Sequence, residues 1–119
     1  MYPAISAPPP AFTKYAQSAQ LSLTLGATLS FTHGMGLTAK LLQVWLECTT
    51  ADGGYSVGDY VLNNGGQYSG IYGIDAVIDS ATVVKAVIGA TGITVPNKGT
   101  GANVNITLAS WRARLRCAA

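Results

Sequence analysis

The feature that most constrains the fold is the alternation of side chains over residues 41 to 49, Leu-Leu-Gln-Val-Trp-Leu-Glu-Cys-Thr. Successive side chains of a β-strand point to opposite faces, so the segment predicts a strand with two distinct faces. One face carries only apolar side chains, Leu42, Val44, Leu46 and Cys48; the other carries Leu41, Gln43, Trp45 and Glu47. Because both faces hold large apolar residues, we expect one face in the core and the other against a neighbouring molecule or an N-terminal arm.

The same two-residue period recurs along the chain after residue 20. It predicts further short strands near residues 21–25, 28–32, 57–62, 71–78, 82–88, 93–95, 104–108 and 111–117. Turn signals rich in Gly, Asn and Pro separate these segments, and none keeps a helical period of 3.6 residues. The pattern predicts an all-β fold, an antiparallel β-sandwich of about 6–8 short strands with an extended N-terminal arm.

The N-terminal residues differ from the rest of the chain. Residues 1–20 lack an apolar period and contain Pro8-Pro9-Pro10, which favours an extended polyproline conformation. They also lack the basic and apolar regions of a signal peptide. We expect an extended Pro-rich arm over residues 1–20 and a β-sandwich domain over residues 21–119. Such an arm is disordered in a monomer, or docks its aromatic residues Phe12 and Tyr15 on a neighbouring subunit.

The charge content indicates what surrounds the domain. Only 10% of the 119 residues are charged, against about 25% in a typical soluble domain. No apolar run approaches the roughly 20 residues that span a bilayer, so we expect no membrane segment. Low charge favours a subunit whose surface is covered by neighbours in a large assembly; the alternative is a monomer with an uncharged polar surface. The net charge of +2 is too small to predict a nucleic-acid partner.

Residues for catalysis or metal binding are scarce. His33 is the only histidine, and beside a Gly-x-Gly turn it is more typical of a strand end than of a ligand rim. Asp52 and Asp59 flank a Gly-rich loop, where turn capping is a better interpretation than a calcium site. The two cysteines, Cys48 and Cys117, cannot provide a four-ligand zinc site. We therefore expect no enzyme, no metal site and no cofactor.

The last predicted strand carries the sharpest charge pattern. Arg112, Arg114 and Arg116 share one face, opposite Trp111, Ala113, Leu115 and Cys117. If this strand pairs with residues 41–49, Glu47 neutralises one arginine and both cysteines lie in the core. Two cysteines could form one bridge, but buried free thiols that act as small hydrophobic residues are the favoured interpretation. The arginine face is either solvated, a subunit interface or a contact for an anionic ligand.

Tyrosines gather in the loop-rich residues 55 to 72. Tyr combines an apolar ring with a polar tip, which suits sugar stacking, protein interfaces and core packing alike. If these tyrosines bind a ligand, we expect the rim of the binding site to consist of His33, Tyr55, Tyr60, Tyr68 and Tyr72.

Three segments resemble bacteriophage tail-fibre and virion-appendage modules. They are residues 31–36, Phe-Thr-His-Gly-Met-Gly; residues 41–59, with a strand ending in Cys-Thr and a Gly-Tyr-x-x-Gly-Asp loop; and residues 109–117, Ala-Ser-Trp-Arg-Ala-Arg-Leu-Arg-Cys. The resemblance implies a sandwich similar to the H-type lectin fold, which commonly forms trimers. It also implies assembly in the host cytoplasm into a virion, with other virion proteins as partners.

These features lead to two functional hypotheses. The first is a structural subunit of a bacteriophage particle, such as a capsid decoration, head-spike, tail or baseplate component, that forms a homo-oligomer, in particular a trimer. Its interface would consist of Phe12, Tyr15, Trp45, Arg112, Arg114 and Arg116. The alternative is a carbohydrate-binding module of a tail fibre that recognises a host surface glycan, where several weak sites in one oligomer add avidity.

Overall fold

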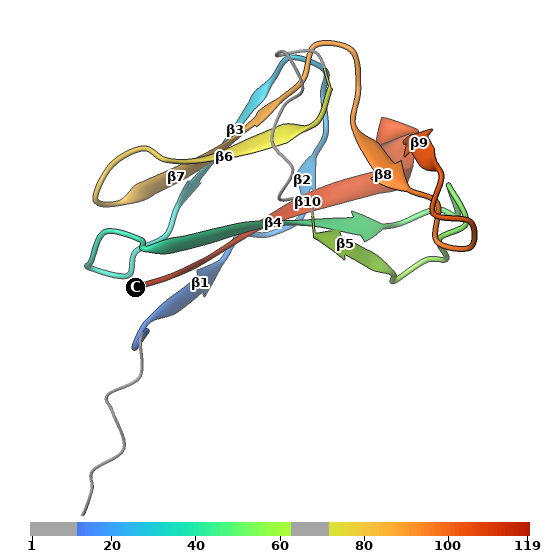
Figure 1. Ribbon diagram of the computed structural model, residues 1–119. Coiled ribbons are helices and arrows are strands. Elements are labelled where there is room, and N and C mark those ends of the chain that lie inside the picture. The colour runs from blue at the N-terminus through green and yellow to red at the C-terminus, as the bar shows by residue number, and fades with distance from the viewer. Residues whose placement is uncertain (1–11, 63–71) are drawn as a thin grey trace, which may run out of the picture.

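The computed structural model describes residues 12–62 and 72–119. Within them the fold is almost entirely β, as the alternation predicted, and two sheets lie one above the other (Figure 1). The elements in chain order are β1 (Tyr15–Gln17), β2 (Leu21–Ser22), β3 (Thr28–Thr32), β4 (Leu41–Cys48), β5 (Tyr60–Leu62), β6 (Ile74–Ile78), β7 (Val83–Ile88), β8 (Thr94–Pro96), β9 (Asn103–Asn105), a 3-10 turn (Leu108–Ser110) and β10 (Trp111–Ala118).

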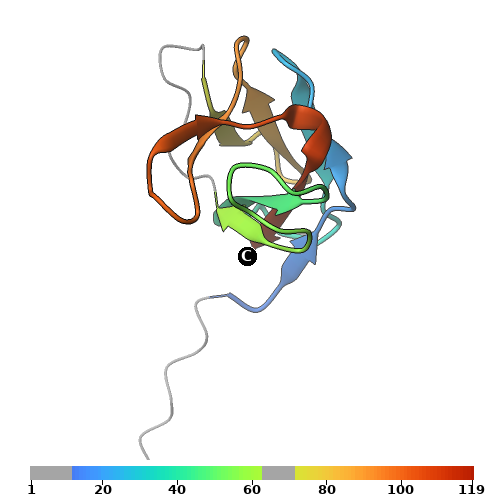
Figure 2. The same cartoon turned by 90° about the vertical axis from the view of Figure 1, so that its right-hand side faces the viewer.

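The strands form two layers and a short ribbon. The larger sheet has the order β1-β10-β4-β5, and β2 also pairs with β10. The smaller sheet has the order β3-β7-β6, and β8 pairs with β9 in a separate ribbon at one end of the sandwich (Figure 2). All of these strand pairs are antiparallel. The expected antiparallel, sandwich-like fold is confirmed, with ten described strands instead of about 6–8.

The core lies between the two sheets. The five-stranded sheet contributes Val44, Leu46, Cys48, Trp111, Ala113 and Leu115, and the three-stranded sheet contributes Ile74, Val84, Ala86 and Ile88. In β4, β7 and β10 the buried residues alternate with more exposed ones. For β4 and β10 the inward face is the one that the period-two pattern predicted.

The central pair, β4 and β10, has the expected partners. Trp111 lies opposite Cys48, and Cys117 lies opposite Leu42. Both cysteines are buried free thiols, and burial raises the pKa of each. They lie six residue pairs apart along the ladder, roughly 20 Å at the usual strand rise, which excludes a bridge between them. The prediction of free thiols on the core face is confirmed.

The sheet begins earlier in the chain than the expected domain boundary at Leu21. β1 pairs with β10, so that Tyr15 lies opposite Ala118 and Gln17 opposite Arg116. Between β1 and β2, the amide of Ser18 donates to the carbonyl of Leu115 at 2.9 Å, and its hydroxyl accepts from the amide of Leu115 at 3.0 Å. Residues 15–18 are thus an edge of the sandwich domain, and residues 1–11 of the expected arm lie outside the described residues.

None of the described helical segments has the length and hydropathy that crossing a membrane requires.

Candidate functional site

The outer face of the five-stranded sheet brings together most of the interface residues that the sequence predicted. Strand register places Arg112 beside Glu47 and then Tyr60, and the next row holds Arg114, Trp45 and Leu62. A third row holds Gln17, Arg116 and Gln43, and a fourth holds Tyr15, Ala118 and Leu41. Directly opposed residues of an antiparallel pair point to the same side, so these twelve side chains form one surface, here called the outer face.

The three arginines of the outer face each have partners within the chain. Arg112 donates to the carbonyls of Ala109 and Trp111, at 3.1 and 2.7 Å. The guanidinium of Arg114 forms a salt bridge with Glu47 at 3.2 Å and also donates to the carbonyl of Ser18. That of Arg116 lies over the ring of Trp45, 4.2 Å from its centroid. Each arginine of the ladder therefore has a contact within the chain, and Glu47 neutralises one of the three positive charges.

Glu47 neutralises one arginine, as predicted. Its salt bridge is with Arg114 and not with the directly opposed Arg112. The amide of Gln20 donates to the Glu47 carboxylate at 2.6 Å. This hydrogen bond, followed by those from Arg114 and Tyr60 and the charge of Arg114, lowers the pKa of Glu47. Partial burial acts in the opposite direction but does not outweigh these contacts.

Replacing Glu47 by Gln is expected to weaken the acid dependence of stability. A carboxylate whose pKa is depressed on folding stabilises the protein above its unfolded pKa of about 4.3, and that contribution is lost as the pH falls through the folded pKa. The wild type should therefore exceed Glu47→Gln in stability by about 1 kcal/mol at pH 7, a typical value for a partly exposed charged pair. The difference should shrink toward pH 3.

Urea unfolding of both proteins between pH 7 and pH 3 measures this effect. Glutamine keeps the shape and can still accept from Gln20, so the comparison isolates the charge. A gap that is constant with pH would show that the Glu47 carboxylate does not titrate differently in the folded and unfolded states. Asp59 has a similarly lowered pKa because Lys98 donates to it, and its acid dependence should remain in both proteins.

Aromatic side chains form a connected cluster on the outer face. Trp45 and Tyr60 pack edge to face, with ring centroids 5.3 Å apart. The indole Nε1–H of Trp45 donates to the side-chain oxygen of Gln43 at 3.1 Å. With Arg116 stacked on the same ring, Trp45 is held in one orientation from three sides. Such fixed aromatic side chains are typical of binding surfaces, because little rotamer entropy is lost when a partner covers them.

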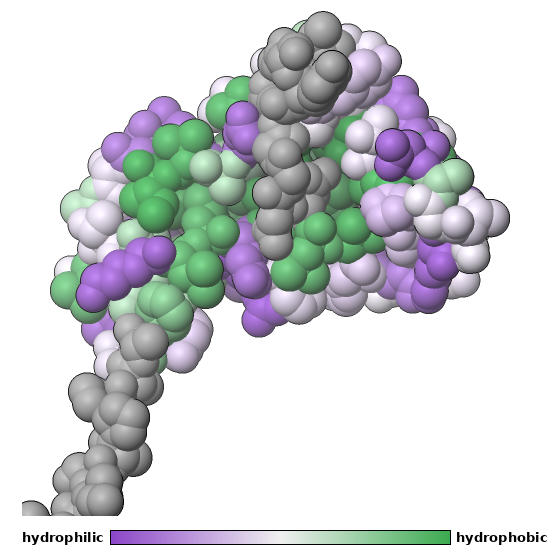
Figure 3. Space-filling view, viewed as in Figure 1, coloured by the Kyte–Doolittle hydropathy of each residue, from purple (hydrophilic) through white to green (hydrophobic). Residues whose placement is uncertain are grey.

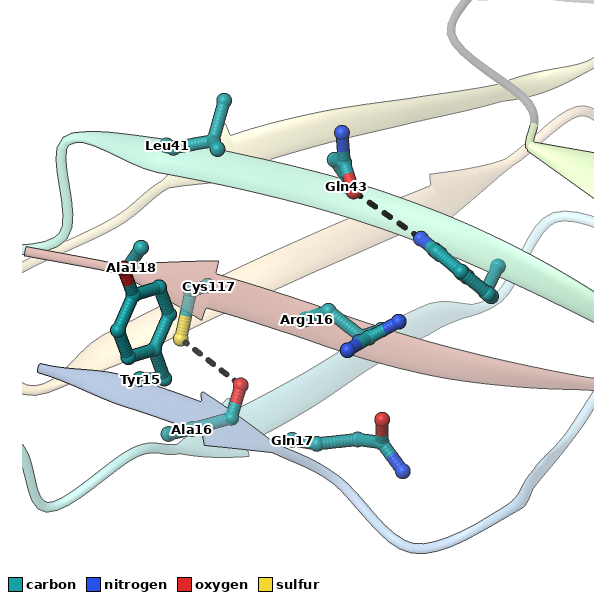
Figure 4. A pocket seen from close by; sticks show the side chains of 9 residues that line it. Tyr15, Ala16, Gln17, Leu41, Gln43, Arg116, Cys117 and Ala118 are labelled. Atoms are coloured by element: carbon teal, nitrogen blue, oxygen red, sulfur yellow. Dashed lines mark hydrogen bonds between the residues drawn. The ribbon is translucent and has the colours of Figure 1, made fainter. Parts of the chain in front are cut away.

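A hollow of about 490 Å³ lies at the β1 side of this cluster (Figure 4). Its walls include Tyr15, Gln17, Leu41, Gln43, Trp45 and Arg116. Ala118 lies between Tyr15 and Leu41 in the register of β1, β10 and β4, and also lines the hollow. The hollow exists because this central residue has only a methyl group while its neighbours on both sides are large.

The expected ligand rim of His33 and four tyrosines is not gathered on this face. His33 is buried, and its Nδ1 accepts the amide of Met35, as expected of a strand-end histidine. Tyr55 is also buried, packs against Trp111 and donates its hydroxyl to the carbonyl of Pro96. Tyr60 lies on the outer face, and Tyr72 is half-buried in a bridge to Gly92. Tyr68 lies outside the described residues.

Of the two acidic loop residues, Asp59 caps a turn as the sequence indicated, whereas Asp52 connects its loop to residues more than 50 positions further along the chain. Asp52 accepts hydrogen bonds from the amide of Thr107 and the indole of Trp111, at 2.8 and 2.9 Å. Asp59 accepts from the amide of Ser56 and from Lys98. Across residues 12–62 and 72–119, no three His, Cys, Asp or Glu side chains cluster as a metal site would require.

Sequence reasoning missed three contributors to the outer face, namely Gln17, Leu62 and Ala118. It placed Leu41 and Gln43 on the same face of the strand as Trp45, but did not name them as interface residues. No local sequence pattern predicts that Gln17 and Ala118 lie on this face, because their position depends on the pairing of β1 with β10, two strands from opposite ends of the chain. Phe12, the remaining expected interface residue, is half-buried, and its carbonyl accepts the hydroxyl of Tyr15.

Comparisons with protein-family models, with curated proteins and with solved structures found no match. The resemblance to bacteriophage modules therefore stays a prediction from the sequence.

Proposed function

We propose that this chain is a non-enzymatic structural subunit of a bacteriophage particle, in which copies assemble into a homo-oligomer through the outer face of the five-stranded sheet. The observation that carries the proposal is the concentration of exposed apolar side chains on that face. Four of the nine large apolar residues exposed by 41% or more in the described chain lie there, namely Tyr15, Leu41, Tyr60 and Leu62. The bacteriophage context and the expectation of a trimer come from the sequence resemblance.

The electrostatics of the outer face favour a protein neighbour over a polyanion. Arg112 and Arg114 already donate to carbonyls and to Glu47. A nucleic-acid backbone would have to displace these contacts, and affinity for it depends on cations free to replace its counterions. The outer face instead matches the composition of protein interfaces, in which Tyr, Trp and Arg are enriched.

Exposed apolar residues also occur outside the outer face, and one of them can serve as a control position in a mutational test. Val77 and Ile78 of β6 are exposed by 42% and 41%. Figure 3 shows apolar residues over the left and middle of the visible surface, whereas the end with β8 and β9 is mostly polar or neutral. Val77 lies opposite Lys85 on the side of the small sheet that faces away from the core. It is therefore a control for Leu62, which is exposed by 43% on the outer face.

The test is the mass of the full chain in solution. Light scattering at micromolar concentration should give a multiple of the 12.3 kDa chain mass. Leu62→Glu should reduce that mass to the monomer, since it buries a charge in the interface. Val77→Glu should leave the oligomer intact. A monomeric wild type would overturn the proposal, and so would an oligomer that survives Leu62→Glu but dissociates with Val77→Glu.

Carbohydrate recognition is the second candidate, and the hollow favours it. Amide, guanidinium and tyrosine groups around an open depression are suited to a glycan. Against it, the ring of Trp45 already carries Arg116 on one face and Tyr60 at its edge, which leaves Tyr15, 72% exposed, as the accessible stacking ring. Binding of the full chain to a glycan array, abolished by Tyr15→Ser, would establish this function in place of a purely structural one.

A further inference from the structure

We infer that the hollow between Tyr15 and Leu41 receives the proline segment Pro8-Pro9-Pro10 of a second copy of this chain. The inference rests on the proposed assembly and assigns its contact: an arm from one subunit held in the outer face of the next. Proline-rich segments bind shallow grooves lined by aromatic rings, and their limited freedom makes this binding inexpensive in entropy. The accessible ring of the hollow is that of Tyr15, with the aliphatic Leu41 across from it; Trp45, covered by Arg116, is part of the wall.

The hydrogen-bonding groups of the hollow and of the proline segment are complementary. Proline has a carbonyl acceptor and no backbone N–H donor, so a run of three presents acceptors only. The side-chain oxygen of Gln43 already accepts from Trp45, which leaves its NH2 group as a donor. Arg116 adds guanidinium donors beside it. Among the described residues that line the hollow, none carries a carboxylate that would repel the carbonyl oxygens.

The dimensions also agree. Three residues in the polyproline conformation span about 9 Å, at about 3.1 Å each. Tyr15 on β1 and Leu41 on β4 are separated by the single strand β10, which places their strands about 10 Å apart. A proline run of this length therefore matches the spacing of the two strands that carry Tyr15 and Leu41.

The direction of the chain at residues 13 and 14 favours a second copy as the donor of the arm. The amides of Thr13 and Lys14 both donate to the carbonyl of Ala119, and the amide of Ala119 donates to the carbonyl of Lys14. The chain thus enters β1 from beyond the end of β10, on the side away from Arg116. A return over its own hollow would require a reversal within Ala11 and Phe12, because residues before prolines are restricted to extended conformations.

Site-directed cross-linking of full-length chains tests the inference. An isotopically labelled Ala7→Cys chain is mixed with unlabelled Gln17→Cys, which places one thiol beside the prolines and the other at the rim of the hollow. The control partner is Ser30→Cys, exposed in β3 of the other sheet. After mild oxidation, mass spectrometry quantifies the mixed disulfides. The native thiols are buried and compete little. We expect the Gln17 pair to exceed the Ser30 pair at least about tenfold, from the effective concentration of a docked arm.

A second pair of variants tests the aromatic wall. Adding Tyr15→Ser to the Gln17→Cys chain should bring cross-linking down to the Ser30 level. Val57→Ser, which changes a side chain of similar exposure outside the hollow (70% against 72%), should leave it unchanged. Equal yields at Gln17 and Ser30 would overturn the arm assignment, as would a Tyr15→Ser variant that cross-links like the parent.

The mass of each sample before oxidation separates this inference from the proposed function. If the oligomer is intact but the Gln17 pair cross-links no more than the Ser30 pair, the arm docking is wrong and the proposed assembly stands. The hollow would then be a candidate site for a glycan. A monomeric sample contradicts both. A chain bearing Ala7→Cys and Gln17→Cys together that forms only an internal disulfide at high dilution shows docking within one copy, and overturns the assignment to a second copy.

Discussion

Replacing Trp111 by alanine is expected to lower the free energy of unfolding by about 3–5 kcal/mol, the usual cost of truncating a buried aromatic residue. Trp111 is fully buried at the start of β10 and packs edge to face against Tyr55, with ring centroids 5.3 Å apart. Its indole also donates to Asp52 at 2.9 Å. Since a domain of this size has a total stability of about 5–15 kcal/mol, the loss threatens folding itself.

Trp45→Ala is the matched control, because Trp45 is the same residue type on the opposite face of the same sheet. It is half-buried, so its removal should cost clearly less in the protomer. Urea unfolding at two protein concentrations separates the two effects, since only a loss of assembly depends on concentration. Trp111→Phe keeps most of the volume and measures the contact with Asp52 separately. Equal protomer losses for Trp111→Ala and Trp45→Ala would mean that the two faces of the sheet are wrongly assigned.

Removal of residues 1–20 is expected to destabilise the domain strongly, whereas removal of residues 1–11 should change its protomer stability little. The longer deletion removes β1 and exposes the edge of β10. It also takes away both partners of Leu115, the Ser18 amide and the Ser18 hydroxyl. Each lost hydrogen bond contributes about 0.5–1.5 kcal/mol net, and residues 13, 14 and 18 make five of them with Leu115 and Ala119, so the combined loss should reach several kcal/mol.

Denaturant midpoints of the two truncated chains measure this difference. Ser18→Ala removes the two contacts of the buried hydroxyl, the hydrogen bond from the Leu115 amide and the one to the carbonyl of Ala19, and should cost about 1–3 kcal/mol. Ser22→Ala, an exposed serine in β2, is the control and should stay within about 0.5 kcal/mol of the wild type. If both truncated chains unfold at the same midpoint, residues 12–20 are a dispensable arm and β1 contributes nothing to the domain.

The fold class and the two faces of the central strands were predictable from the sequence. In β4 and β10 the period of two is uninterrupted, so the inward and outward residues of both strands followed from local chemistry. The single glutamate, the three arginines and the two cysteines then indicated how these strands pair. The register of β4 and β10 confirms the pairing, which brings Glu47 to Arg114 on one side and buries both thiols on the other.

The candidate site was less predictable, because its residues depend on contacts far apart in the chain. Tyr55 looked like a free rim residue in a Gly-rich loop, but its ring packs on Trp111 and its hydroxyl reaches Pro96. Residues 15–17 have no apolar alternation, and they become a strand only because the edge of β10 offers hydrogen-bonding groups about 100 residues away.

The sequence by itself thus determined the all-β class and which side of each central strand is buried, since side-chain alternation is a local property. Only the tertiary structure decided the edge of the domain and the hollow above Ala118. That hollow arises because Ala118 of β10 lies between Tyr15 of β1 and Leu41 of β4. These three residues come from distant parts of the chain, so no local sequence pattern predicts that they lie side by side.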